Sequence, residues 1–189
     1  MKTIRLLSLA FFAMISLSAT ETFAQKEKTV TVGGAPMYPS KNIVENAVNS
    51  KDHTTLVAAV QAAGLVETLQ TPGPFTVFAP DNAAFEKLPA GTVETLVKPE
   101  NKATLTGILT YHVVAGKLGS KEIADAIKKG NGKATLTTVQ GGTLTAWMQG
   151  KDLYITDENG NKSKVTIADV YQSNGVIHSI DTVVLPKSE

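Results

Sequence analysis

The chain has 189 residues, a formal net charge of +1 and no cysteine. The lack of cysteine excludes disulfides and thiol chemistry, so the fold must be held by its hydrophobic core. The near-neutral charge, with lysines scattered along the chain, argues against a nucleic-acid-binding protein.

The first 24 residues have the pattern of a secretory signal peptide. Lys2 and Arg5 precede an apolar run from Leu6 to Leu17, and Thr22-Phe23-Ala24 supplies a cleavage pattern. The apolar run is shorter than the roughly 20 residues that span a bilayer, and no second such run follows. We therefore expect residues 1–24 to be removed, the protein to be periplasmic or secreted, and the mature chain to lack a membrane span.

The rest of the chain is predicted to form one domain. Residues 25–39 combine charged residues, Gly33-Gly34 and two prolines, a composition that predicts a flexible N-terminal arm. We place the domain at 40–186 and a short tail at 187–189. No internal repeat or low-complexity tract interrupts it.

Helical patterns dominate the first half of this domain. Asn42 and Glu45 form a capping-box pattern for a short helix, and a second helix is expected from about Asp52 to a C-terminal Gly64. After Pro72-Gly73-Pro74 the residues 75–80 predict a buried strand.

The next elements follow in the same way. Asp81 is expected to begin a helix that runs to Leu88, and Pro99 is expected to start another. The second of these places Leu105, Ile108, Leu109 and His112 on one face, and the segment 111–114 then predicts a strand.

Strand patterns dominate the second half. After a short helix around 120–128 we expect an antiparallel meander with strands at about 134–139, 143–148, 153–157, 164–168 and 176–185. Glycine-containing pairs at 141–142, 149–150 and 159–160 supply its turns. The separation of helices from strands predicts an α+β fold.

The last predicted strand carries branched apolar residues on both faces, so we expect other elements to cover both sides. It follows the turn Asn174-Gly175 and contains His178. A histidine buried there needs a hydrogen-bond partner, for which Asp81, Asn174 or a backbone carbonyl is suitable. The same reasoning makes His112 a core histidine.

Three blocks of this sequence resemble the signature blocks of the fasciclin (FAS1) domain family. They are Phe75–Phe85, Tyr111–Leu118 and Asn174–Asp181, in the family's order and spacing, and the resemblance spans residues 40–186. It implies a two-sheet β wedge with helices packed on it, a role in extracellular adhesion or matrix contacts, and no catalysis. The motif positions Asp81, His112, Asn174, Gly175 and His178 are assigned a structural role.

No residue pattern predicts an enzyme, a metal site or a cofactor. The three histidines lack metal-ligand spacing, and neither a GxSxG motif nor a glycine-rich phosphate loop is present. The segment 157–161 resembles a calcium loop, but Lys162 stands where that loop requires glycine.

The resemblance also implies where a partner could bind. The family's tyrosine-histidine adhesion motif is matched by Tyr111 and His112, and its second adhesion segment falls on residues 167–171, where the aspartate-aliphatic pair is kept. The partner-binding candidates are therefore Tyr111, His112, Asp169, Val170 and Tyr171. We expect Asp169–Asn174 to be a surface loop, with Tyr171 as the main contact.

Two further questions stay open at this level. Trp147 is either an exposed contact for a sugar or a protein, or a residue packed under a neighbouring element. The function suggested is a secreted or periplasmic binding module for a cell-surface or matrix protein or glycan. The alternative is a carrier of an apolar small molecule such as a carotenoid or lipid, which the resemblance to an algal branch of the family implies.

Overall fold

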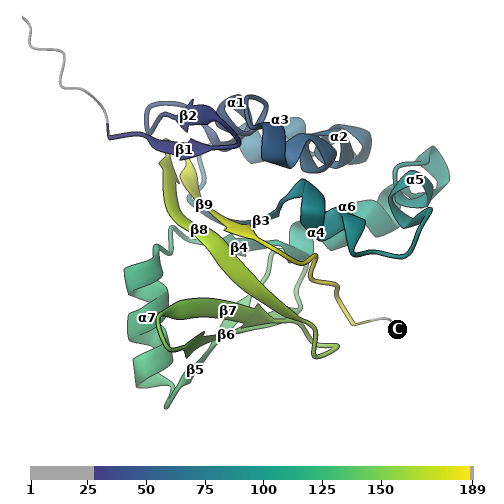
Figure 1. Cartoon of the computed structure of the whole chain (residues 1–189). Helices are drawn as coiled ribbons and strands as arrows, with labels where there is room; N and C mark the ends of the chain where they lie inside the picture. Colours follow the sequence, from purple (N-terminus) through teal and green to yellow (C-terminus); the bar gives the residue numbers. More distant parts are fainter. Residues whose placement is uncertain (1–27, 188–189) are drawn as a thin grey trace, which may run out of the picture.

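The computed structural model describes residues 28–187. The predicted signal peptide, the start of the predicted arm and the last two residues lie outside this range. Within it, helices occupy mainly the first half and strands the second, which confirms the α+β class (Figure 1).

Seven strands form one hydrogen-bonded series in the order β4-β3-β9-β8-β7-β6-β5. The antiparallel meander from β5 to β9 is confirmed, whereas the parallel pairing of β3 with β9 was not predicted. A bridge between Val114 and Thr138 joins the two edges, so the sheet is nearly closed. The bounds are β3 (Phe75–Pro80), β4 (Val113–Ala115), β5 (Lys133–Thr137), β6 (Thr143–Gln149), β7 (Asp152–Thr156), β8 (Lys162–Gln172) and β9 (Gly175–Ile180).

Strand β8 is shared by two halves of this sheet, which are β4-β3-β9 on one side and β7-β6-β5 on the other. Its first residues, 162–164, pair with β7, and the stretch from Val165 to Gln172 pairs with β9. Two register shifts interrupt the second pairing, and Asp169 adopts a left-handed φ of 60° within the second shift, between Ile167 and Val170. Such bulges bend a strand, which lets one long strand serve both halves.

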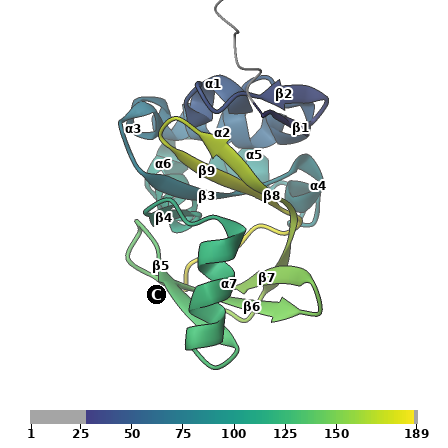
Figure 2. The ribbon, with the colours of Figure 1, turned by 90° about the vertical axis from the view of Figure 1, so that its left-hand side faces the viewer.

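The helices lie on two sides of this sheet (Figures 1 and 2). Helices α1–α3 lie above β3 and β9, and α7 lies beside β5 and β6. Their bounds are α1 (Ile43–Ala47), α2 (Thr54–Ala63), α3 (Val66–Gln70), α4 (Asn82–Glu86), α5 (Thr92–Leu96), α6 (Lys102–Tyr111) and α7 (Ser120–Lys129), with 3₁₀ turns at Lys51–His53 and Pro99–Asn101.

The predicted helix signals are confirmed in three places. Asn42 and Glu45 cap α1 reciprocally through bonds of 2.9 and 2.8 Å. Gly64 ends α2 with a φ of 72°, and the Asp81 carboxylate accepts the Ala84 amide of α4 at 2.7 Å.

Strand β9 separates two hydrophobic cores, and all six of its residues are buried. Ile180 and Phe78 belong to the core that faces α7, while Ile177 and Val77 belong to the core beneath α1, α2 and α6. The expectation that this strand is covered on both faces is therefore confirmed.

The prediction of a flexible arm does not hold for residues 28–39. They form a hairpin of β1 (Val30–Val32) and β2 (Ala35–Met37), with Val32 and Met37 buried in the core. The turn is Gly33-Gly34 with φ values of 57° and 77°, and two positive φ angles are what a tight two-residue hairpin requires. These glycines were interpreted as a sign of flexibility, but they make a turn.

Three other boundaries differ from the prediction. Tyr111 ends α6, so the following strand starts at Val113 and not at 111. The final strand ends at Ile180, and α5 was not predicted. The expected loop Asp169–Asn174 is mostly strand, because β8 continues through its bulge to Gln172.

Candidate functional site

Tyr111 and His112 are buried, with exposed fractions of 0% and 2%. The Tyr111 hydroxyl donates to the Thr143 carbonyl at 2.6 Å, and burial raises the pKa of Tyr111 to about 12. His112 accepts the Val184 amide on Nε2 and contacts the Ile108 carbonyl through Nδ1, and burial lowers its pKa to about 4. These two side chains tie the end of α6 to β6 and to the C-terminal segment, so neither presents a surface to a partner.

His178 joins two segments that are distant in sequence. Its Nε2 lies 2.8 Å from the Leu118 carbonyl, and its Nδ1 accepts the Asp169 amide at 3.3 Å. Burial lowers the pKa of His178, which matches a neutral ring with one donor and one acceptor. The predicted bond to a backbone carbonyl is confirmed for both histidines, whereas Asp81 and Asn174 bond elsewhere.

Asn174 and Gly175 have structural roles. The Asn174 side chain accepts the Ile43 amide at 3.0 Å and donates to the Leu69 and Thr71 carbonyls, so it joins α1, α3 and β9. A Cβ on Gly175 would lie 2.3 Å from the carbonyl oxygen of Phe75, a distance that real Cβ atoms do not show. Glycine is required because β3 passes this close.

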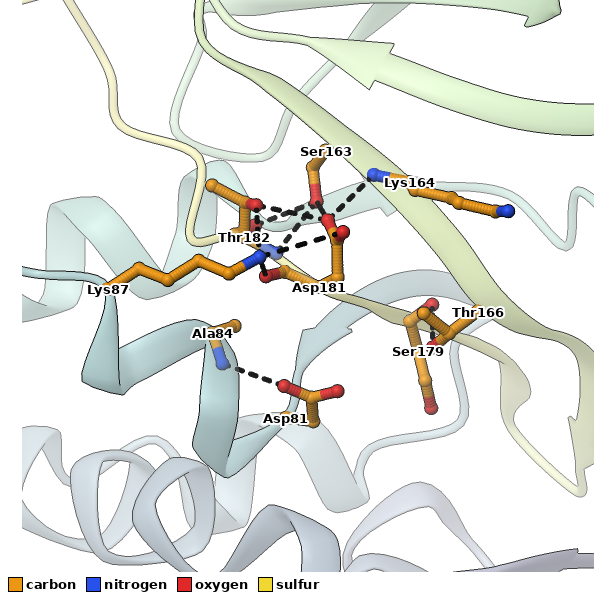
Figure 3. A network of polar contacts seen from close by, with 9 residues as sticks. All are labelled: Asp81, Ala84, Lys87, Ser163, Lys164, Thr166, Ser179, Asp181 and Thr182. Atoms are coloured by element: carbon orange, nitrogen blue, oxygen red, sulfur yellow. Dashed lines mark hydrogen bonds and ion pairs between the residues drawn. The ribbon is translucent and has the colours of Figure 1, made fainter.

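The end of the last signature block forms a polar network (Figure 3). The Asp181 carboxylate accepts the Lys164 amide at 2.9 Å and lies 3.6 Å from the Lys87 ammonium. The Lys87 ammonium also bonds the Asp181 carbonyl. This network joins the end of α4, the start of β8 and the chain after β9, so its role is structural.

Asp169 caps helix α7 from outside the helix. Its carboxylate accepts both the backbone N–H of Ser120, at 2.7 Å, and the Ser120 hydroxyl. Gly119, the residue that precedes α7, has no side chain to do this. No local sequence pattern indicates this pairing, because Ser120 lies 49 residues away and the bulge that orients Asp169 depends on the pairing of β8 with β9.

Tyr171 is the one partner-binding candidate with a large exposed side chain. It is 41% exposed, whereas its neighbour Val170 is 1% exposed. The Lys117 ammonium lies 5.4 Å from the Tyr171 ring centroid, and burial followed by the nearby Asp169 charge raises the tyrosine pKa. We call the group Lys117, Asp169 and Tyr171 the Tyr171 surface; Lys117 was not predicted as part of it.

Trp147 is half-buried on the outer face of the sheet. Its ring stacks on Tyr154 of the neighbouring strand, with centroids 4.9 Å apart, and its Nε1 donates to the Thr156 hydroxyl at 2.9 Å. Lys162 places its ammonium 5.4 Å from the indole. Trp147 therefore packs against side chains of the strands β7 and β8.

An apolar cavity of about 280 Å³ lies between the helices α1–α3 and the strands β3 and β9. Its lining is almost entirely aliphatic and aromatic, and none of the lining residues is charged. Representative lining residues are Ile43, Ala47, Val60, Leu69, Phe75 and Ile177.

Ser50 and His53 lie at the edge of this cavity and have the spacing of a nucleophile and a base. The Ser50 hydroxyl is 2.9 Å from Nδ1 of His53, and Nε2 lies 3.3 Å from the Ser179 hydroxyl. A catalytic histidine is oriented by a third group, usually a carboxylate, and a serine hydroxyl takes that place here. Burial lowers the pKa of His53, and both of its ring nitrogens are occupied by hydroxyls.

Residues 28–187 contain neither a metal-binding cluster nor a membrane-spanning helix. No group of three or more His, Asp or Glu side chains there is placed to hold a metal ion. No helix in the same range is both long and apolar enough to cross a membrane.

Comparison with known proteins gives a consistent result. A family model described as the fasciclin domain matches residues 51–186. Protein sll1483 of Synechocystis is 47% identical over 85% of this chain and 82% of its own length. The cell surface glycolipoprotein MPB83 of Mycobacterium bovis is 36% identical over 76% of this chain and 60% of its own length. The structure of a FAS1 domain pair from the insect cell adhesion molecule fasciclin I matches with a TM-score of 0.68 and 18% identity, over 85% of this chain and 58% of that one.

Proposed function

Since the chain belongs to the fasciclin domain family, we propose that it is an exported, non-catalytic binding module for a cell-surface or matrix partner. The partner is a protein or a glycan, and it contacts the Tyr171 surface. The observation that carries this proposal is the position of Tyr171, an exposed aromatic side chain on a strand whose surroundings are fixed. Tyrosine is enriched among the residues that dominate binding energy.

The frame around Tyr171 supports the proposal. Asp169 is held by Ser120 and by His178, and Lys117 donates to the Gln172 carbonyl at 3.1 Å. Side chains presented by a fixed frame lose little conformational freedom on binding, which favours affinity. The names of two similar proteins, a cell surface glycolipoprotein and a cell adhesion molecule, agree with a role at the cell exterior.

A non-catalytic role is the simplest account of the polar groups. The three histidines have partners on both ring nitrogens, and in each of them burial lowers the pKa. An enzyme of acyl or phosphoryl transfer needs a nucleophile and a base that can reach a substrate. Replacement of Tyr171 by alanine tests the proposal, and Tyr38 offers a matched control.

A second function, carriage of an apolar small molecule, is favoured by the cavity of about 280 Å³ under α1–α3. Soluble proteins place such molecules in concave, mostly apolar pockets of this order of size. An apolar molecule that copurifies with the protein after expression in its own host, and that is recovered in an organic extract, supports this function. An organic extract free of any such molecule argues against it.

A further inference from the structure

The cavity under α1–α3 is larger than the ordinary voids of a protein interior. Protein interiors are packed as densely as organic crystals, and voids larger than a water molecule are few. A volume of about 280 Å³ is nearly twice that of an engineered cavity of about 150 Å³ that stays dry and binds benzene. The apolar walls of this hollow lack packing partners on the cavity side, and an apolar occupant would supply them.

The cavity wall reaches the surface, which gives an occupant a way in. Val48, at the end of α1, lines the cavity and is 52% exposed, and Val44 on the same helix is half-buried. Val57 and Val60 of α2 are also half-buried and lie along the same wall. Large apolar side chains that remain partly exposed around a hollow mark an entrance.

The polar groups in the wall decide the chemistry of the occupant. The hydroxyl of Ser50 and the ring of His53 bond each other, and Thr110 donates to the Thr106 carbonyl at 2.7 Å. In residues 28–187 every buried side-chain nitrogen and oxygen has a partner. An occupant with a charged group inside would therefore lose its hydration without gaining an ion pair, because no lining residue is charged.

A wall that is shared with a second cavity limits the length of the occupant. Leu109 and His112 line this cavity and also a second apolar cavity of about 300 Å³ beneath α4, α5 and α6. His112 is fixed by hydrogen bonds to Ile108 and Val184. These two side chains form a wall between the cavities, so a long chain cannot pass from one into the other without moving them.

From these observations we propose that the cavity under α1–α3 binds a compact, uncharged apolar molecule and excludes charged or long-chain ligands. This inference rests on the second of the proposed functions, carriage of an apolar small molecule, and adds the place and the ligand class.

The experiment compares three fluorescent probes on the mature chain. Phenylnaphthylamine is compact and neutral, anilinonaphthalene sulfonate is the same molecule with one sulfonate added, and diphenylhexatriene is neutral but long. We expect the first to bind at least tenfold more tightly than the other two. Equal binding of the sulfonate, or tighter binding of the long probe, overturns the ligand class while leaving a carrier function in place. Failure of all three probes overturns the carrier function as well.

Variants then locate the binding site. Ala47→Leu and Val60→Phe each add bulk to the cavity wall, and both should weaken binding of phenylnaphthylamine at least tenfold. Ala62→Leu adds the same group as the first variant on the exposed face of α2 and should change nothing. Fluorescence of the single Trp147, which lies in β6 and does not line the cavity, reports folding. Folded Ala47→Leu and Val60→Phe proteins that bind the probe like the unmodified chain would place it elsewhere and refute the proposal.

Discussion

The Asp169 carboxylate and Ser120 are joined by two hydrogen bonds, one from the backbone N–H and one from the hydroxyl of Ser120. Asp169 stands at a bulge in β8, and Ser120 is the first residue of α7. One side chain therefore fixes the strand that carries Tyr171 to the helix beside it. An acidic group at a helix N-terminus is also favoured by the helix dipole.

We predict that Asp169→Ala lowers the free energy of unfolding by about 1 to 2 kcal/mol, because the carboxylate that caps the start of α7 is removed. Denaturant unfolding measures this change. Asp125→Ala is the control, since Asp125 makes only exposed ion pairs with Lys121 and Lys128 on α7 and such pairs contribute little. Equal effects of the two replacements would show that the cap is unimportant.

Two glycine replacements should act in opposite directions. Gly175→Ala places a Cβ 2.3 Å from the Phe75 carbonyl oxygen and should destabilise the fold by about 2 kcal/mol or more, because backbone must move. Gly107→Ala lies in α6 with nothing within 4 Å of the new Cβ and should stabilise it by about 0.5 to 1 kcal/mol. Thermal melting distinguishes them, and a stable Gly175→Ala protein would contradict the close approach of β3 and β9.

His112 should make stability depend on pH in a defined window. Its folded pKa of about 4 lies below the ordinary value of 6.5, so as the pH falls the unfolded state takes up a proton first. The stability that His112 contributes is complete above pH 6.5 and is lost between pH 6.5 and about 4, by up to about 3 kcal/mol.

The measurement is denaturant unfolding at several pH values, for the unmodified chain and for His112→Gln. Carboxylates titrate in both proteins and cancel in the difference, so the variant should show a shallower fall in stability over this window. Parallel curves would mean that His112 is protonated in the folded protein near its ordinary pKa.

Residues 1–24 lie outside the part of the chain that the structure describes, so the signal peptide prediction is tested on the exported protein itself. Mass spectrometry of the exported protein should find Gln25 as the N-terminus. An intact Met1 on most of the folded protein outside the cytoplasm would contradict the assigned cleavage.

The sequence predicted local features well and tertiary ones poorly. The capping pair Asn42 and Glu45 and the terminal Gly64 are read from neighbouring residues, and all three are confirmed. The parallel pairing of β3 with β9 depends on residues about 100 positions apart, and no local pattern carries it. The separation of helical from strand patterns predicted the α+β class, and the family resemblance supplied the particular fold within that class.

The candidate site shows the same division. Burial of His112 and His178 followed from their apolar neighbours, and it is confirmed. The Tyr171 segment was predicted as a loop because it links the predicted strand at about 164–168 to the final strand, yet β8 continues through it by means of a bulge. Lys117 was not predicted as part of this surface, because its position there depends on the contact between its loop and β8.

The central claim, that the Tyr171 surface binds the partner, is tested most directly by comparing two tyrosines. Tyr38 is 37% exposed, close to the 41% of Tyr171, and Lys41 places its ammonium 5.1 Å from the Tyr38 ring as Lys117 does for Tyr171. Each is replaced by alanine. Binding is measured on the envelope of the producing cells and on immobilised matrix proteins and glycans.

We expect Tyr171→Ala to weaken binding about tenfold, or about 1.4 kcal/mol, with the melting temperature nearly unchanged. Tyr38→Ala should bind like the unmodified protein. A folded Tyr171→Ala protein that binds with full affinity would contradict the claim and remove this surface from consideration.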